Sequence, residues 1–156
     1  MINALSRALK FAEEPLSEDF ISDAVPLFTK HWIEVGRKDL VFKPQFEIYP
    51  SLYAKGMAKV FTVRKGGVLV GYAIFFIRHH QHYSNDSFAI QDLMFLAKEA
   101  RRGWAGYKFL KFCDESLARD GARVISISVN AKRDFGALLC RLGYSPSETV
   151  YTRRTR

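Results

Sequence analysis

The clearest pattern along the chain is a pair of β-branched and aromatic runs in its middle. These runs are Val60–Arg64 and Val68–Ile77, and Lys65-Gly66-Gly67 separates them. Two such runs joined by a short glycine turn predict an antiparallel β-hairpin. A polar stretch, His79–Asp86, then predicts a break before a third strand at Phe88–Leu96.

Helical spacing of apolar residues appears on both sides of this hairpin. Near the N-terminus, Ser17 is a good helix cap, and Glu18 and Asp19 follow in the first turn, where the helix dipole favours negative charge. Pro26 predicts a kink or a second helical piece ending near Gly36. The irregular segment 37–55 contains two prolines and predicts a loop and a short helix. The apolar helical positions are Phe20, Ile21, Ala24, Leu27 and Phe28.

The C-terminal half predicts a helix, a strand and a second, shorter helix. The first helix carries an apolar stripe and ends at Asp120-Gly121, Val124–Val129 is the strand, and the last helix ends at Gly143. Segments 4–11 and 149–152 add a first and a closing strand. This order predicts an α/β fold with a mixed, mostly antiparallel sheet, one β-α-β crossover and helices on both faces.

Length and composition favour one domain over residues 1–156. The chain is 48% apolar and contains no apolar run of the roughly 20 residues that span a bilayer. Its first residues lack the basic and apolar regions of a secretory signal, so we expect a cytoplasmic protein that does not enter a membrane. Cys113 and Cys140 lie on apolar stretches of predicted helices, which fits reduced core thiols.

The chain has a formal net charge of +8 and a sequence pI near 9.6. A basic surface attracts nucleic acid, anionic lipid or a phosphorylated cofactor. The basic residues are scattered except in Lys98–Arg102 and at Arg153, Arg154 and Arg156, so charge alone does not choose among these anions.

The strand-to-helix turn at Arg101–Gly106 is more specific. A helix N-terminus presents unpaired amide donors and a partial positive charge, which suit phosphate oxygens. Gly103 and Gly106 let the backbone approach an anion closely, and Arg101 and Arg102 add charged donors. An ordinary tight turn with surface arginines explains the same residues.

The element order and this turn together resemble the GNAT superfamily of N-acetyltransferases over almost the whole chain. The chain offers Arg101-x-x-Trp104-x-Gly106 for the family's Gln/Arg-x-x-Gly-x-Gly/Ala, with Trp104 at the middle glycine. The resemblance implies acetyl-CoA as the cofactor. It implies that the backbone of Phe95, Leu96 and Ala97 pairs with the pantetheine arm. It also implies a pyrophosphate site made by the amides of Arg101, Arg102, Gly103, Trp104, Ala105 and Gly106.

A closer similarity is to GNAT-like proteins often encoded by bacteriophages. It implies a protein of the host cytoplasm or one associated with the virion. The residues that carry it are His31-Trp32-x-Glu34, Leu69-Val70-Gly71-Tyr72, His80-x-His82-Tyr83, Asp92-x-x-x-Leu96 and Arg141-Leu142-Gly143-Tyr144.

Asp92 is the first candidate for the general base, because it interrupts an apolar strand beside the implied pantetheine site. A salt-bridged carboxylate at the sheet edge is the alternative. His80, His82 and Tyr83 are expected to relay the proton or shape the substrate pocket, unless they belong to an ordinary polar loop.

His31 and Glu34 either face the substrate cleft or form a polar helix face. The spacing of His31, His80 and His82 permits a metal, but the superfamily needs none, so we expect no metal site. The tyrosine that many GNAT enzymes use as general acid falls at Leu139, so no proton donor carries over. A thiol with a pKa near 8.5 is a tolerable leaving group without one.

The leading hypothesis is acetyl transfer from acetyl-CoA to a primary amine by direct attack in a ternary complex. The amine belongs to a small molecule, a peptide or a protein. The main alternative is a non-catalytic, virion-associated or interaction protein with a phage or host partner. A nucleic-acid-binding protein is a third reading, although the chain has no recognisable nucleic-acid-binding motif. Homodimers occur among GNAT proteins, and the sequence does not settle this point.

Overall fold

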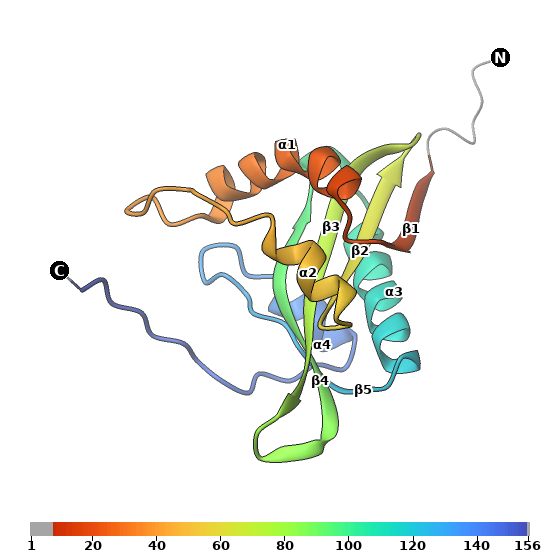
Figure 1. Ribbon diagram of the computed structural model, residues 1–156. Coiled ribbons are helices and arrows are strands. Elements are labelled where there is room, and N and C mark those ends of the chain that lie inside the picture. Colours follow the sequence, from red (N-terminus) through yellow and green to blue (C-terminus); the bar gives the residue numbers. More distant parts are fainter. Residues whose placement is uncertain (1–7, 156) are drawn as a thin grey trace.

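The computed structural model describes residues 8–155, which form one five-stranded sheet with strand order β1-β2-β3-β4-β5 (Figure 1). The pairs β1–β2, β2–β3 and β3–β4 are antiparallel, and β5 runs parallel to β4. The mixed, mostly antiparallel sheet expected from the sequence is therefore confirmed. The strands are β1 (Leu9–Glu14), β2 (Ala58–Lys65), β3 (Val68–His80), β4 (Tyr83–Leu96) and β5 (Ala122–Ser126).

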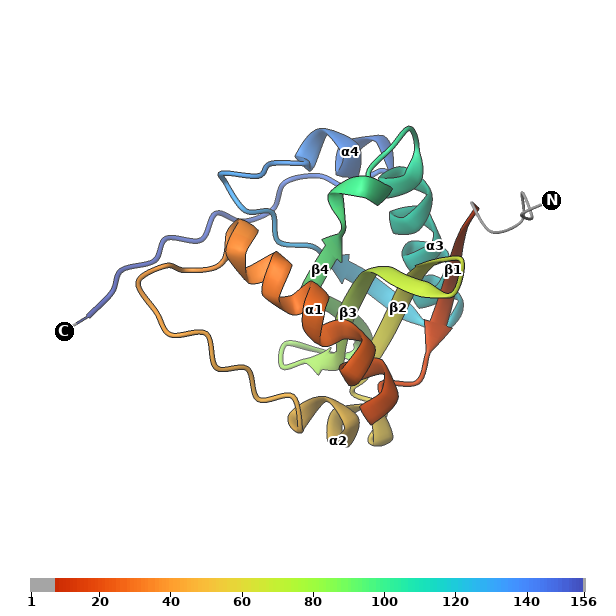
Figure 2. The same ribbon diagram turned by 90° about the horizontal axis from the view of Figure 1, so that it is seen from above.

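Helices cover both faces of the sheet (Figure 2). On one face lie α1 (Glu18–Val35) and α2 (Ile48–Ala54), and on the other lie α3 (Ala105–Arg119) and α4 (Gly136–Arg141). A short 3₁₀ turn, Lys98–Ala100, leads from β4 toward α3. None of the helices in residues 8–155 is long and apolar enough to cross a membrane.

The first helix begins as the sequence predicts and is not broken by its proline. The Ser17 hydroxyl accepts a hydrogen bond of 3.3 Å from the amide of Phe20. Pro26 lies inside the continuous helix Glu18–Val35, on its exposed face. Its ring removes one helical hydrogen bond, but water can satisfy the freed carbonyl there.

The β2–β3 hairpin has the predicted glycine turn, because Gly66 and Gly67 both adopt positive φ angles of 56° and 83°. The predicted break at 79–86 is wrong: β3 continues to His80, and β4 begins at Tyr83. This end of the hairpin is largely exposed on both faces, so its strands carry polar residues without losing backbone pairing.

The last part of the chain differs more from expectation. The fifth strand covers 122–126 rather than 124–129, and the predicted strand at 149–152 is wrong. Val150 and Tyr151 are 78% and 90% exposed. As neighbours they would point to opposite faces of a strand, so they supply no single apolar face to bury. The predicted first strand lies partly in residues 1–7, outside the described residues, and β1 is displaced toward Glu14.

Candidate active site

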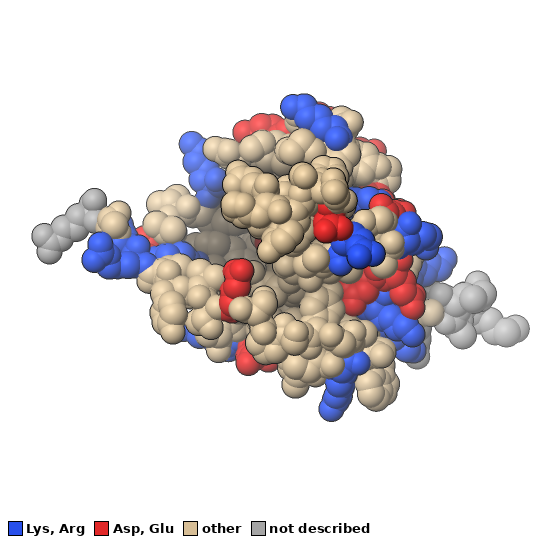
Figure 3. All heavy atoms as spheres, turned by 90° about the horizontal axis from the view of Figure 1, so that it is seen from below, with Lys and Arg blue, Asp and Glu red and all other residues tan. Residues whose placement is uncertain are grey.

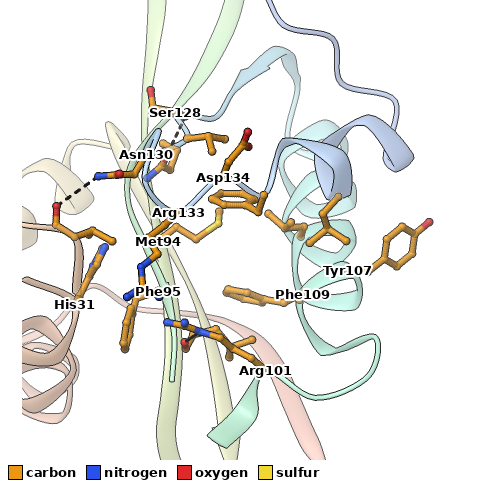
Figure 4. Close-up of a pocket in the computed structure, with 18 of the residues that line it drawn as sticks. His31, Met94, Phe95, Arg101, Tyr107, Phe109, Ser128, Asn130, Arg133 and Asp134 are labelled. Atoms are coloured by element: carbon orange, nitrogen blue, oxygen red, sulfur yellow. Dashed lines mark hydrogen bonds between the residues drawn. The ribbon is translucent and has the colours of Figure 1, made fainter. Parts of the chain in front are cut away.

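The two parallel strands β4 and β5 separate at the centre of the molecule. They pair from Ser87 with Ala122 to Ile90 with Ser126. Beyond Ile90, β4 continues to Leu96 while β5 has ended, so no strand within residues 8–155 pairs with the outer edge of residues 91–96. A cavity of about 930 Å³ opens there, with Met94 and Phe109 pointing toward each other across it (Figure 4). This volume lies at the upper end of the range of ligand pockets.

A β-bulge in β4 directs Asp92 out of the regular alternation. Leu93 pairs with Ile74 and Gln91 pairs with Phe75, so Asp92 is the extra residue. Bulges of this kind re-aim side chains. The Tyr49 hydroxyl on α2 donates a hydrogen bond of 2.7 Å to Asp92 Oδ2. Burial raises the pKa of Asp92, and the Tyr49 hydrogen bond only partly offsets this effect.

The turn after β4 presents several free backbone donors. Within residues 8–155, the amides of Arg102, Gly103, Trp104, Gly106 and Tyr107 donate no hydrogen bond. The amides of Arg101 and Ala105 are occupied, because they donate to the carbonyls of Lys98 and Arg102. Five unpaired donors at the start of the fifteen-residue helix α3 are an arrangement that can accept an anion.

Trp104 does not fill this turn. Its φ angle is −93°, so the position does not require glycine. The side chain is 60% exposed and packs edge-on against Tyr107, with ring centres 5.5 Å apart. Gly103 does need glycine-like freedom, because its φ is 57°. A tryptophan at the family's middle glycine is therefore compatible with an open backbone cradle.

The Arg101 side chain faces α1 rather than the anion turn. Its guanidinium donates to both carboxylate oxygens of Glu34 at 2.8 and 3.0 Å, and its Nε donates to the Leu96 carbonyl at 2.6 Å. Arg133 adds a second ion pair with Glu34, at 3.6 Å. The Arg101 hydrogen bond lowers the pKa of Glu34. Glu34 thus joins α1 to the end of β4. Glu34 and Arg101 were both predicted to be site residues, and their charges neutralise each other in this pair.

His31 lies on the same helix and lines the cavity. Its ring stacks on Phe95 at 5.0 Å, and its Nδ1 lies within hydrogen-bond distance, 2.8 Å, of the Tyr72 hydroxyl. Burial lowers the pKa of His31 to about 4, so the imidazole is neutral at physiological pH. Burial also raises the pKa of Tyr72 strongly, which keeps its phenol protonated.

A second, smaller cavity of about 160 Å³ adjoins the first. His31, Val35 and Leu93 line both cavities. Its other walls are mainly aromatic and come from α1, segment 37–47, Tyr49 and Tyr72. The first cavity is lined by the open strand edge and by four of the five residues with free amides, Gly103, Trp104, Gly106 and Tyr107. The second cavity lies on the α1–α2 side of β4.

The structure does not bring His80, His82 and Tyr83 to this site. They lie at the far end of the β3–β4 hairpin, and none lines either cavity. Their rings pack against one another, and the His80 Nδ1 accepts from the His82 amide at 3.1 Å. Residues 8–155 contain no group of three or more His, Cys, Asp or Glu side chains placed to hold a metal ion.

Leu139, where the GNAT resemblance places the general-acid tyrosine, is buried in α4, and Cys140 beside it is exposed. Neither lines the large cavity, whose α4 wall comes from Leu138 and Arg141. Sequence reasoning missed the roles of Tyr49, Tyr72 and Arg133. The one available signal was a tyrosine in the apolar run of β3, where a buried hydroxyl needs a partner.

The face of the molecule in Figure 3 shows no single basic patch. On the face seen in Figure 3, Lys and Arg side chains lie around the edge and alternate with Asp and Glu. The excess positive charge is thus spread over that face, which gives no focused track for a nucleic acid backbone.

No model of a known protein family matches this sequence, and no curated protein matches it. Solved structures do resemble it. An aminoglycoside acetyltransferase from an uncultured soil metagenomic sample, crystallised with sisomicin, matches with a TM-score of 0.73 and 14% identity, over 95% of this chain and 96% of that one. The protein has the GNAT fold.

Two further structures with the same fold are similar over almost their whole lengths. Glucosamine-6-phosphate N-acetyltransferase from Arabidopsis thaliana has a TM-score of 0.70 and 10% identity, over 96% of this chain and 100% of that one. A predicted acetyltransferase from Clostridium acetobutylicum, solved with acetyl-CoA, has a TM-score of 0.70 and 8% identity, over 94% and 96%. These proteins thus share the GNAT fold at sequence identities that are too low to identify a substrate for this protein.

Proposed function

We propose that this protein is a GNAT-superfamily N-acetyltransferase that transfers the acetyl group of acetyl-CoA to a primary amine. The observation that carries the proposal is the joint placement of the open β4 edge and four of the five residues with free amides along one cavity. The edge can pair with an extended amide chain, and the amides can bind a pyrophosphate. The crystal structure of the Clostridium neighbour with acetyl-CoA and the acetyltransferases among the other neighbours support the same activity.

The residues present fit this cofactor. The outer edge of residues 91–96 is free of strand pairing, and Trp104 leaves the turn accessible. Gly71 lets β3 approach β4 here, since a Cβ on it would lie 2.7 Å from Leu96 Cδ1 and 3.0 Å from the Phe95 carbonyl oxygen. Acetyl-CoA would supply the acyl group, so that a C–N bond forms as the C–S bond breaks. CoA would depart as the thiolate, which takes up the proton that the acylated nitrogen loses.

Asp92 would accept the proton of the attacking amine. An alkylammonium has a pKa near 10.4, so its deprotonation at neutral pH costs about 4–5 kcal/mol without help. Burial raises the pKa of Asp92, which makes this carboxylate a better base. Tyr49 holds Oδ2, leaving Oδ1 for the amine. Neutral His31 and Tyr72 would position the acceptor rather than take its proton.

Calorimetric titration with acetyl-CoA tests the proposal. We expect saturable binding to the wild type and at least about a tenfold loss in Gly106→Trp, whose indole would block the turn. Gly106→Ala is the matched control, because a Cβ at this position meets only Leu138 Cδ2, at 3.5 Å. Asp92→Asn should keep the affinity and lower turnover by about 10²–10⁴-fold. No binding of acetyl-CoA by the wild type would reject the proposal.

A further inference from the structure

The second cavity has an unusual lining for a site that must receive an ammonium ion. Phe28 stacks on Phe46 with ring centres 4.9 Å apart, and Trp32 stacks on Phe42 at 5.4 Å. Among residues 8–155, no Lys, Arg, Asp or Glu lines it, and His31 is neutral because burial lowers its pKa to about 4. Lys38 lies beside the cavity, with its Nζ 4.4 Å from the Trp32 ring centre. The walls therefore favour an uncharged, apolar group.

The size of this cavity limits what it can hold. A cavity of about 150 Å³ with apolar walls accepts one benzene molecule. The cavity here is about 160 Å³. It has room for a single six-membered ring or a branched aliphatic group.

Asp92 is the carboxylate of the large cavity that adjoins the second cavity. Three acidic residues line the large cavity, Glu34, Asp92 and Asp134. Glu34 is paired with Arg101 and Arg133, and Asp134 is an exposed residue that does not line the second cavity. Asp92 lies beside Leu93 and accepts its hydrogen bond from Tyr49, and both of these neighbours line the second cavity. A polycation would place its other charges against the apolar walls of the second cavity, where they would be unpaired.

We infer that the acceptor is a small primary monoamine with a short chain between its amino group and an aromatic or branched apolar group. The amino group would lie at Asp92, and the apolar group would lie against Phe46 in the second cavity. This inference rests on the proposed function and narrows it to one substrate class. It sets this site apart from that of the aminoglycoside acetyltransferase crystallised with sisomicin, which shares the fold.

Acetyl transfer to four amines tests the inference, with CoA thiol release as the readout. We expect kcat/KM for phenethylamine to exceed that for spermidine and sisomicin by about 10–100-fold, the effect of burying one apolar group. Phe46→Ala should enlarge the cavity and shift the ratio of tryptamine to phenethylamine turnover by about tenfold toward tryptamine. The matched control is Phe112→Ala, whose ring packs against Phe11 and Phe61 on the other side of the sheet. It should leave the ratio unchanged.

A binding measurement separates this inference from the chemistry. Phenethylamine titrated into the wild-type protein saturated with CoA should give saturable heat, and spermidine should give none. If Phe46→Ala does not fold, Phe42→Ala at the partly exposed wall serves in its place. Faster acetylation of spermidine or sisomicin, or no phenethylamine binding, would overturn the acceptor inference while the proposed function stands. Absence of acetyl-CoA binding would overturn both.

Discussion

The Tyr49 hydroxyl on α2 reaches across 43 residues of sequence to donate a 2.7 Å hydrogen bond to Asp92 at the bulge of β4. This bond lowers the pKa of Asp92 against the larger, opposite effect of burial. Its removal in Tyr49→Phe should therefore raise that pKa further. We expect the acidic limb of the kcat/KM profile to move to higher pH, because Asp92 acts only when ionised.

Tyr53→Phe is the matched control for Tyr49→Phe. Tyr53 lies on the same helix, is exposed, and its hydroxyl makes no hydrogen bond within residues 8–155. Its removal should leave the profile unchanged. Coincident profiles for Tyr49→Phe and wild type would show that the bond does not tune the base.

Buried, neutral His31 should make the stability of the fold depend on pH. Its pKa falls from 6.5 to about 4 on folding, so the unfolded chain binds the proton more tightly. The resulting stabilisation is complete above pH 6.5 and is lost as the pH falls toward 4, by up to about 3 kcal/mol. Urea unfolding at several pH values measures it. His31→Gln keeps a hydrogen-bond partner for Tyr72 but does not titrate, so the stability of this variant should fall less over this pH range. Parallel plots of unfolding free energy against pH for the variant and the wild type would show that His31 does not cause the effect.

The Glu34–Arg101 pair should stabilise the junction of α1 with β4. The Glu34 side chain is 11% exposed and that of Arg101 is 34% exposed. Glu34→Gln leaves the guanidinium without its charged partner, and we expect the free energy of unfolding to fall by about 1–3 kcal/mol. Asp39→Asn breaks the exposed pair with Arg37 and should cost clearly less. Equal effects of the two substitutions would assign Glu34 no special role in the fold.

Trp104 should contribute to the binding of the nucleotide end of acetyl-CoA. Its exposed ring lies at the free-amide turn and lines the large cavity with Tyr107. Stacking of a base on an aromatic side chain contributes about 1–3 kcal/mol. Trp104→Ala should therefore weaken acetyl-CoA binding by about 5–100-fold and spare acetylpantetheine, which lacks the nucleotide. Tyr151→Ala, which removes an exposed ring in the C-terminal segment, should alter neither. Equal weakening of both ligands would point to damage to the turn.

Local signals predicted most of the fold. The Ser17 cap, the Gly66-Gly67 turn and the alternating strands each depend on a few neighbouring residues, and all three appear in the structure. The prediction of a closing strand at 149–152 is wrong, because β-branched and aromatic residues alone do not supply a strand with which the segment can pair.

The site was harder to predict, because its contacts join distant segments. The bulge that re-aims Asp92 and its bond to Tyr49 leave no mark in the local pattern. His80 and His82 were expected near Asp92 because their polar segment reads as a loop feeding the strand. The ten residues from His82 to Asp92 instead form an extended strand. At about 3.3 Å per residue, this strand places His82 roughly 30 Å from Asp92.

The proposed donor and acceptor sites depend on different kinds of structure in this protein. The open strand edge and the free amides are backbone features of β4 and of the start of α3, so few single substitutions can remove them. Phe42, Pro44 and Phe46, by contrast, line the second cavity from a segment that pairs with no strand. If the proposed function holds, mutations in that segment can alter which amine is selected while leaving the sheet intact. Acceptor preference would then be free to diverge rapidly among descendants of this sequence, with the acetyl donor retained.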